Sequence, residues 1–312
     1  MKSEVIAATP LYQPVMAALE AAFTVHRLFE APDRKAFLAG MKGKPLGIAT
    51  FGGAMNAELM DALPQLKIIA CMSVGVDNVD LAAAKARGIR VTNAPDVLTD
   101  DVADIAIALL IGVTRQIPQA DRYVREGKWV AKSSMPLATK LGGSTMGVLG
   151  LGRIGLAIAK RAEALGVKIV YHGPREKSGV GYRYYPDLAA MAKDVDYLMV
   201  ACPGGAETRN LVDAKVIEAL GAKGVIVNIA RGSVVEEPAM VKALVEGKLR
   251  GAGLDVFADE PRVPEALLKL DNVVLLPHVG SATHATRRAM GQLMIDNLSA
   301  FFAGKPLLTP VV

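Results

Sequence analysis

The feature that most constrains the fold of this chain is a glycine pattern near its middle, Gly150-Leu151-Gly152-Arg153-Ile154-Gly155. It follows an apolar run at 146–149 and opens an alanine-rich helical stretch at 156–165. In a strand–turn–helix unit, the first glycine permits the tight turn, the second lets the backbone approach a pyrophosphate, and the third allows close helix–strand packing. The free N–H groups of the helix N-terminus would bind that pyrophosphate. The pattern therefore predicts a dinucleotide-binding site rather than an ordinary turn.

The position of this pattern predicts two domains, because a cofactor domain that starts so late needs another domain ahead of it. The 312 residues suffice for two domains of ordinary size, each with its own core. The N-terminus lacks a signal-peptide core, and no apolar run is long enough to span a bilayer. Two cysteines, Cys71 and Cys202, lie in separate apolar segments, which favours packed thiols in a reducing cytoplasm.

The net charge of +5 is modest for this length and is not gathered into a basic run. We therefore expect no nucleic-acid surface and no membrane partner. A mild positive charge is compatible with anionic substrates and cofactors.

Short apolar runs alternate with helical stretches through the first hundred residues. Strands are predicted at 5–9, 24–28, 46–51, 67–72 and 90–92, and helices at 13–22, 33–40, 56–63 and 78–88. Asp33 and Asn56 are predicted N-caps, and Gly88 a C-terminal stop. This alternation indicates a parallel sheet covered on both faces, which is a doubly wound α/β domain.

The rest of the chain contains a second alternating set. A helix at 100–116 is apolar nearly all round and is expected to be buried between domains or at a subunit interface. A more polar arm, 117–143, leads to the glycine pattern, and five further strands are predicted at 168–172, 197–202, 224–228, 253–256 and 273–276. A long amphipathic helix at 285–302 follows the last strand, and the simplest arrangement returns it to the first domain.

The predicted fold is thus α/β with two doubly wound domains. Residues 1–98 plus 284–312 form a discontinuous, flavodoxin-like substrate-binding domain, and residues 99–283 form a Rossmann dinucleotide-binding domain.

The loop after the second cofactor-domain strand bears on which dinucleotide binds. Domains of this kind that bind NAD carry an acid there for the ribose hydroxyls, but here His172 or Gly173 occupies that place. Arg175, helped by Lys177 or Ser178, could instead bind a 2′-phosphate. Charge-assisted hydrogen bonds of this kind contribute about 1.5–3 kcal/mol, which is roughly a 10- to 100-fold preference for the phosphorylated cofactor. The sequence favours NADP(H) over NAD(H).

Two alternatives stay open for this loop. A different loop path would bring Glu176 to the ribose. Arg175 and Lys177 could also be solvated surface charges.

Three polar residues each follow a predicted strand: Arg231, Glu260 and His278. Taken singly, they read as a surface charge, a loop acid and a turn residue. Ligands of open α/β sheets bind beyond the carboxyl ends of the strands, where all three lie. Together, and downstream of a dinucleotide pattern, they predict a catalytic site.

These stretches, in this order, resemble the D-isomer-specific 2-hydroxyacid dehydrogenases, from about Gly47 to the C-terminus. The resemblance includes 73–80, 92–95 and 97–100 besides the segments above. The glyoxylate/hydroxypyruvate reductase branch matches best, through 278–283, 302–307 and the arginine-bearing loop without the acid.

The resemblance implies an NADP(H)-preferring reductase of a small 2-keto acid, glyoxylate or hydroxypyruvate. Arg231 would orient the substrate's carboxylate and keto oxygen. His278 would be the general acid that protonates the oxygen as hydride arrives, and Glu260 would keep the imidazole protonated near neutrality. Asp259 is the rival for the last role, but the motif register selects Glu260. Backbone N–H groups at Val74 and Gly75 match the loop that binds the substrate carboxylate.

The same register assigns residues to the cofactor. Asp255 matches the residue that anchors the nicotinamide carboxamide, and Cys202 would have a packing role. The loop at 202–208 departs from the family pattern, because Gly204 and Gly205 replace a commoner Leu-Thr. The expected cofactor-binding residues are Thr99, Gly150, Leu151, Gly152, Arg153, Ile154, Gly155, Gly173, Arg175, Lys177, Cys202, Pro203, Thr208, Ile229, Ala230, Asp255 and Gly280. No metal site is expected, since the histidines and cysteines are dispersed.

The remaining expectations concern the oligomeric state and two alternative functions. A homodimer is expected from the apolar helix at 100–116 and the arm that follows it. Trp129 matches a tryptophan often present in the family's dimerisation arm, where packing is favoured over contact with a substrate, including one in the partner subunit. A phosphoglycerate or larger 2-keto-acid dehydrogenase is disfavoured by the missing ribose acid and the lack of an extra regulatory domain. A nucleotide-sensing transcriptional corepressor shares this fold, but the intact Arg/Glu/His set and the lack of a disordered tail favour catalysis. The remaining histidines, His26, His172 and His284, are expected to be structural or solvated.

Overall fold

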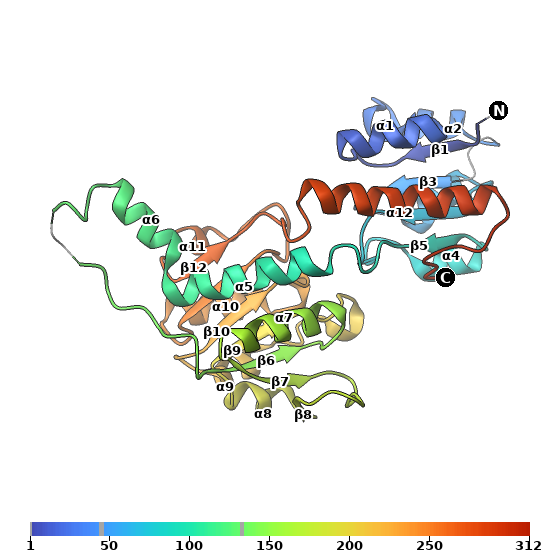
Figure 1. The fold of residues 1–312 in the computed structure, drawn as a ribbon. Coiled ribbons are helices and arrows are strands. Elements are labelled where there is room, and N and C mark those ends of the chain that lie inside the picture. The colour runs from blue at the N-terminus through green and yellow to red at the C-terminus, as the bar shows by residue number, and fades with distance from the viewer. Residues whose placement is uncertain (1, 44–46, 132–133) are drawn as a thin grey trace. The chain divides into compact units, whose positions relative to one another are not determined.

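The chain divides into two compact units in the computed structural model, which describes residues 2–43, 47–131 and 134–312 (Figure 1). The first unit runs to Leu98 and resumes at Ser281–Val312, and the second is Thr99–Gly280. The chain returns to the first unit between Gly280 and Ser281, slightly before the predicted boundary between 283 and 284.

The first unit is built on a five-stranded parallel sheet in the order β2-β1-β3-β4-β5. Its strands are β1 (Glu4–Ala7), β2 (Thr24–Arg27), β3 (Gly47–Thr50), β4 (Ile68–Cys71) and β5 (Arg90–Thr92). The strand order reverses between β1 and β3, which is the flavodoxin-like order. Residue 46, where the third strand was predicted to begin, lies outside the described residues.

Six helical segments accompany this sheet: α1 (Gln13–Ala22), η1 (Leu28–Glu30), α2 (Arg34–Gly40), α3 (Ala57–Ala62), α4 (Leu81–Ala86) and α12 (His284–Phe302). The side chains of Asp33 and Asn56 cap α2 and α3 as predicted. The predicted helix at 78–88 is shorter than expected, because Asp80 caps α4 and the preceding residues form a turn. The long helix α12 packs against α1, β3 and β4, so the chain's last helix belongs to the first unit.

The second unit is built on a seven-stranded parallel sheet in the order β12-β11-β10-β9-β6-β7-β8. Its strands are β6 (Thr145–Leu149), β7 (Lys168–His172), β8 (Arg183–Tyr185), β9 (Tyr197–Val200), β10 (Val225–Asn228), β11 (Gly251–Leu254) and β12 (Val273–Leu275). The order reverses between β6 and β9, so ligands are expected beyond the ends of these two strands. The sequence analysis missed β8, because a three-residue edge strand that starts with an exposed arginine carries no alternating apolar pattern.

The helices of this unit are α5 (Thr99–Arg115), α6 (Ile117–Arg125), α7 (Arg153–Ala164), α8 (Leu188–Lys193), α9 (Ala214–Leu220), α10 (Glu237–Val245) and α11 (Glu265–Leu268), with the short segments η2 (Ala206–Thr208) and η3 (Gly232–Val234). Helix α5 packs against α7 and against β10, β11 and β12. Helix α5 therefore buries apolar residues within its own unit, whereas its sequence predicted burial between domains or at a subunit interface.

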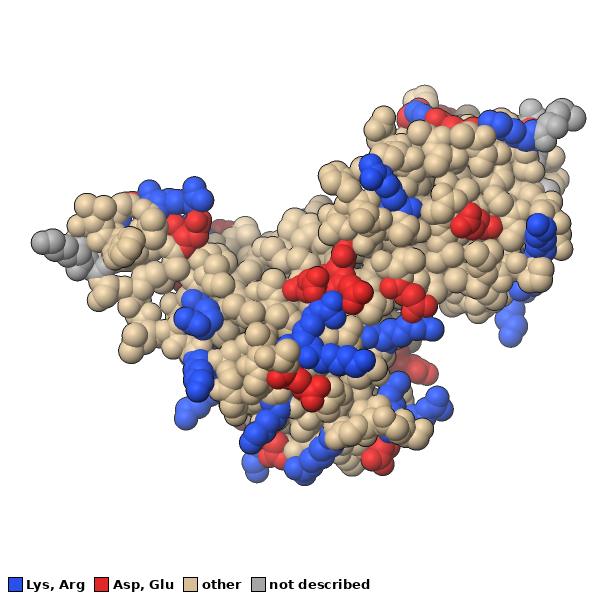
Figure 2. Space-filling view, in the orientation of Figure 1, with Lys and Arg blue, Asp and Glu red and all other residues tan. Residues whose placement is uncertain are grey.

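The surface carries both signs of charge. On the face that Figure 2 shows, acidic and basic side chains are intermingled over the described residues. Arg161 pairs with Asp100 and with Asp104, at 2.9 and 2.7 Å. Within the described part of the chain, no helix is both long and apolar enough to cross a membrane.

Candidate active site

The glycine turn after β6 has the geometry that its sequence predicts. Gly150 has a φ of +93°, and a Cβ there would come within 2.6 Å of the Cys202 nitrogen in the loop after β9. A Cβ on Gly155 would overlap the carbonyl oxygen of Gly150. Gly152, the N-cap of α7, faces open space. The first and third glycines therefore let the two loops and the helix pack closely, and the second leaves the helix N-terminus accessible.

The neighbouring residues complete this turn. Leu151 is buried beneath it, while Arg153 and Ile154 begin the first turn of α7. Thr99, at the start of α5, is partly exposed.

The loop after β7 is held by tyrosines from β7 and β8. The Tyr184 hydroxyl donates to the carbonyl oxygen of Gly173 at 3.0 Å, and the Lys177 N–H donates to the Tyr171 hydroxyl at 2.9 Å. The missed strand β8 therefore fixes the path of the loop that carries the predicted cofactor selectivity.

The side chains between these anchors are exposed. Arg175, Glu176 and Lys177 all lie on the surface, and no ion pair joins Arg175 to another described residue. Its guanidinium is thus available to an anionic ligand at this end of the sheet.

The loop after β9 contains a buried thiol and two glycines. Burial raises the pKa of Cys202 to about 11, so the thiol is protonated at neutral pH and packs rather than reacts. The Thr208 hydroxyl donates to the carbonyl oxygen of Pro203 at 2.8 Å, which closes the loop. Gly205 has a φ of +140°, a conformation that a larger residue rarely adopts.

A buried asparagine shapes the loop after β10. Oδ1 of Asn228 accepts the N–H of Ala230 at 3.0 Å, and its Nδ2 donates to the carbonyl oxygen of Arg231 at 2.9 Å. Nη1 of Arg231 in turn donates to the Ala230 carbonyl at 2.7 Å. Ile229 and Ala230 are buried, while Arg231 is partly exposed. The sequence analysis treats Asn228 only as the end of a strand, although an asparagine at the end of an apolar strand, three residues before the arginine, is a usable signal.

Gly232 brings this loop against the next one. A Cβ at Gly232 would overlap the backbone of Phe257 and Ala258, which follow β11. The Arg231 loop therefore packs against the segment that leads to Glu260.

Asp255 sets the conformation of the loop after β12. Its two carboxylate oxygens accept the N–H groups of Val279 and Gly280, each at 2.8 Å, and its carbonyl accepts the N–H of His278 at 2.9 Å. Burial raises the pKa of Asp255 above its ordinary value, and the two N–H groups oppose that rise. His278 has a φ of +54°, which is unusual for a residue other than glycine and is held by these bonds.

His278 pairs with Glu260. Nδ1 of His278 lies 2.8 Å from Oε2 of Glu260, and the other carboxylate oxygen accepts the Phe257 N–H at 3.1 Å. The rival acid Asp259 instead binds Arg262 through two bonds of 2.6 Å. The structure therefore brings together the histidine and the acid that the motif register selects.

The Val74–Gly75 loop follows β4 in the first unit. The Ser73 carbonyl accepts the N–H of Ala94 at 2.8 Å, and the Val74 carbonyl accepts Nδ2 of Asn93 at 2.9 Å. In a trans peptide the N–H points opposite to the carbonyl. The N–H groups of Val74 and Gly75 therefore both point away from the 93–94 segment, as a carboxylate-binding loop requires.

A buried residue of α12 supports this loop through the C-terminal segment. Oδ1 of Asn297 accepts the N–H groups of Leu308 and Thr309, at 3.0 and 3.2 Å. The Thr309 hydroxyl then donates to the Asn93 carbonyl at 2.6 Å. This connection spans more than two hundred residues of sequence, and sequence reasoning did not find it.

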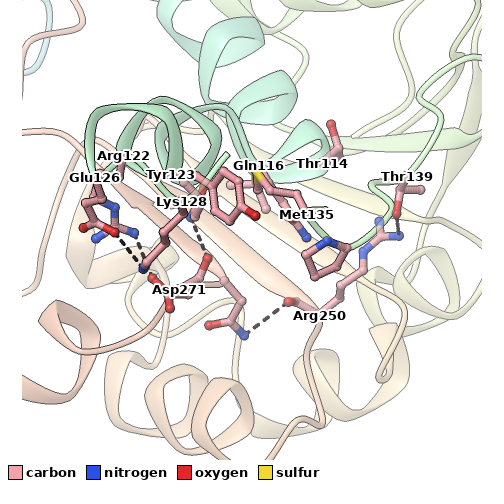
Figure 3. A pocket seen from close by; sticks show the side chains of 14 residues that line it. Thr114, Gln116, Arg122, Tyr123, Glu126, Lys128, Met135, Thr139, Arg250 and Asp271 are labelled. Atoms are coloured by element: carbon pink, nitrogen blue, oxygen red, sulfur yellow. Dashed lines mark hydrogen bonds and ion pairs between the residues drawn. The ribbon is translucent and has the colours of Figure 1, made fainter. Parts of the chain in front are cut away.

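A cavity of about 560 Å³ in the second unit lies apart from these loops (Figure 3). It is lined by residues of α5, α6 and the arm together with Arg250, Asp271 and Asn272, and by none of the predicted site residues. Arg122 pairs with Asp271 at 2.8 Å, and Arg250 binds the Thr139 hydroxyl at 3.0 Å. Among the described residues, no three histidine, cysteine or acidic side chains form a metal cluster.

Comparison with known proteins gives one consistent family. A family model described as "D-isomer specific 2-hydroxyacid dehydrogenase, NAD binding domain" matches residues 107–280. Glyoxylate/hydroxypyruvate reductase A of Arabidopsis thaliana is 50% identical over 297 residues, with 94% of both chains covered. Hydroxyphenylpyruvate reductase of Plectranthus scutellarioides is 50% identical over 296 residues, again with 94% of both covered.

A solved structure extends the similarity to the whole chain. It is an NADPH-dependent glyoxylate/hydroxypyruvate reductase from Sinorhizobium meliloti in complex with NADP and malonate, 46% identical, with a TM-score of 0.94. The match covers 100% of this chain and 97% of that one.

Proposed function

Because this chain belongs to the family of D-isomer-specific 2-hydroxyacid dehydrogenases, we propose that it reduces a small 2-keto acid with NADPH. Glyoxylate and hydroxypyruvate are the proposed substrates, and the product is the corresponding 2-hydroxy acid. The observation that carries this proposal is the His278–Glu260 pair, at 2.8 Å, beside the loop that presents Arg231.

The second unit fits a dinucleotide. The N-terminus of α7 is open at Gly152, and the loops after β6 and β9 meet where the strand order reverses. The proposed cofactor-binding residues are those of the glycine turn, the loops after β7, β9 and β10, and Thr99, Asp255 and Gly280. When bound, the nicotinamide supplies a hydride to the keto carbon of the substrate.

His278 is the proposed proton donor. Because its Nδ1 faces Glu260, Nε2 is the atom left to face the substrate. A protonated imidazole can give the Nε2 proton to the keto oxygen while that oxygen gains negative charge. The carboxylate of Glu260 stabilises the imidazolium and fixes the ring, and the Phe257 N–H fixes the carboxylate.

Carboxylate recognition is proposed for Arg231 and for the Val74–Gly75 loop. A planar guanidinium presents paired N–H donors that match the carboxylate and the neighbouring keto oxygen of a 2-keto acid. Asn228 holds the backbone of Arg231 with a bond of 2.9 Å, so the arginine starts from a defined position. In the first unit, the N–H groups of Val74 and Gly75 are the proposed donors to a carboxylate.

We propose NADP(H) as the preferred cofactor. Supporting this, Arg175 is exposed in a loop whose path is fixed, and no acid occupies the place of His172 or Gly173. Arg175 would bind the 2′-phosphate, with Lys177 adding to the positive charge. The relative from Sinorhizobium meliloti, which is NADPH-dependent, supports the same choice.

A homodimer is also proposed. Large apolar side chains are exposed along the arm, where Trp129, Val130 and Leu137 are 70, 86 and 99% exposed. Exposed apolar residues grouped in this way mark protein–protein contacts. A dimeric mass by light scattering supports the proposal, and a monomeric mass at all concentrations contradicts it.

A cytoplasmic location is proposed as well. The two cysteines, which are buried free thiols, support it.

The test of the proposed function is a keto-acid panel run with NADPH and with NADH. Glyoxylate, hydroxypyruvate, pyruvate, 4-hydroxyphenylpyruvate and 2-ketogluconate are compared by kcat/KM. We expect the highest values for glyoxylate or hydroxypyruvate with NADPH. Turnover of only the larger acids would point to another dehydrogenase of the family, and binding of NADPH without any turnover would favour a nucleotide-sensing role.

A further inference from the structure

Arg287, in the first turn of α12, is a half-buried cation that has no acidic partner among the described residues. Its Nη1 atom is buried and has no hydrogen-bond partner among the described residues. Its guanidinium carbon lies 4.4 Å from the centre of the Phe51 ring. Burial holds the pKa of Arg287 below its ordinary value, and no neighbouring acid opposes that effect. Buried charges are normally paired, so an unmatched guanidinium suggests a ligand that completes it.

The surroundings of Arg287 are ordered before any ligand binds. The Thr9 hydroxyl accepts the N–H of Phe51 at 2.9 Å, and the Thr50 hydroxyl donates to the carbonyl of Gly52 at 2.5 Å. These bonds fix the loop after β3 that carries the ring against the guanidinium. A ligand group that reaches Arg287 therefore meets a preformed site.

A second polar pair stands on the same helix face. The hydroxyl of Tyr12, in the segment between β1 and α1, lies 2.7 Å from Nδ1 of His284, which precedes Arg287 by one helical turn. Tyr12 and Phe51 thus come from the two loops where the strand order of this unit reverses, which is where ligands of such sheets bind.

The proposed carboxylate loop belongs to the same sheet edge. Val74 and Gly75 follow β4, which pairs with β3, and Phe51 follows β3. Helix α12 packs on both strands. The Val74–Gly75 loop and the loop that carries the Phe51 ring against Arg287 therefore follow adjacent strands.

Resting on the proposed function, we propose that Arg287 is a specificity-determining residue that recognises an oxygen on the carbon beyond the keto group. An arginine offers only donors, so the group it takes is an acceptor, namely a hydroxyl or a carboxylate. Hydroxypyruvate carries such a hydroxyl, whereas the methyl group of pyruvate would leave the buried Nη1 unpaired. A site built to bond a hydroxyl rejects the analogue that lacks it far more strongly than an apolar pocket does.

The experiment compares kcat/KM for hydroxypyruvate, pyruvate and glyoxylate, with NADPH, in the unsubstituted enzyme and in two variants. Arg287→Met removes the guanidinium, and Arg288→Met removes an exposed neighbour on the same helix as the matched control. We expect Arg287→Met to reduce the preference for hydroxypyruvate over pyruvate by about 10- to 100-fold, the usual value of a charged hydrogen bond. Glyoxylate has no further carbon, so its kcat/KM should change by less than about 3-fold. Arg288→Met should leave all three substrates unchanged.

A second variant guards against misfolding. Arg287→Lys keeps the charge and the apolar stem but loses the planar fork, so it should show a smaller loss of preference with the same glyoxylate activity. An unchanged hydroxypyruvate-to-pyruvate ratio in Arg287→Met, or an equal loss with glyoxylate, overturns the inference and leaves the proposed function in place. Absence of turnover by the unsubstituted enzyme with every keto acid overturns the proposed function, and this inference with it.

Discussion

Nδ1 of His278 lies 2.8 Å from Oε2 of Glu260, while the adjacent acid Asp259 is occupied by Arg262 at 2.6 Å. The geometry separates two carboxylates that the sequence places side by side. One of them supports the imidazole, and the other closes its own turn.

Glu260→Gln tests whether Glu260 is the acid that supports the imidazole of His278. We expect it to lower kcat/KM for keto-acid reduction by about 10²- to 10⁴-fold, because the amide no longer stabilises the imidazolium. kcat/KM for the keto acid is measured in the variant and in the unsubstituted enzyme, and near-normal kinetics in the variant would contradict the role of the pair.

Asp259→Asn is the matched control for that variant. It removes the exposed ion pair with Arg262, which solvent screens, and should leave kcat/KM unchanged.

Arg231→Lys should reduce kcat/KM by at least about 10²-fold, because an ammonium group cannot bond two substrate oxygens in one plane. NADPH affinity, measured by fluorescence titration, should change little, since the proposed contacts of Arg231 are with the keto acid. Near-normal kinetics in the lysine variant would refute the substrate-orienting role.

Arg175→Ala should weaken NADPH much more than NADH. The loss of a charge-assisted bond to the 2′-phosphate predicts about a 10- to 100-fold rise in the Kd for NADPH. The Kd values for both nucleotides are measured by isothermal titration calorimetry. An equal loss for NADPH and NADH would contradict the assignment and would favour a solvated arginine.

Two glycine substitutions distinguish a glycine needed for packing, Gly155, from one needed for NADPH binding, Gly152. Gly155→Ala places a Cβ against the Gly150 carbonyl and should lower the free energy of unfolding by about 1–3 kcal/mol. Gly152→Ala meets open space, so its stability should stay within about 0.5 kcal/mol while NADPH binding weakens. Urea unfolding and NADPH titration of both variants check this. Equal destabilisation by the two would show that Gly152 also serves packing.

The sequence predicted most of what depends on local chemistry. The glycine turn, the caps Asp33 and Asn56, and the long strands and helices follow from patterns within about twenty residues. The strand β8 could not be predicted, because three residues at a sheet edge gain their conformation from Tyr171 and its neighbours rather than from their own alternation. The start of α4 was misplaced for a similar reason, since Val79 is held by a bridge to Met55.

The sequence by itself determined which chemical groups this chain carries and at which strand ends they stand. Only the tertiary structure decided which of them act on one another. It joined His278 to Glu260 rather than to Asp259, and placed the Asp255 carboxylate beneath the turn of His278. It also tied Asn297, through Thr309 and Asn93, to the Val74–Gly75 loop, and it gave Arg287 no acidic partner in the described part of the chain. Residue order sets the type and spacing of polar groups, but their pairing depends on hydrogen bonds and burial that arise only when distant strands and helices pack together.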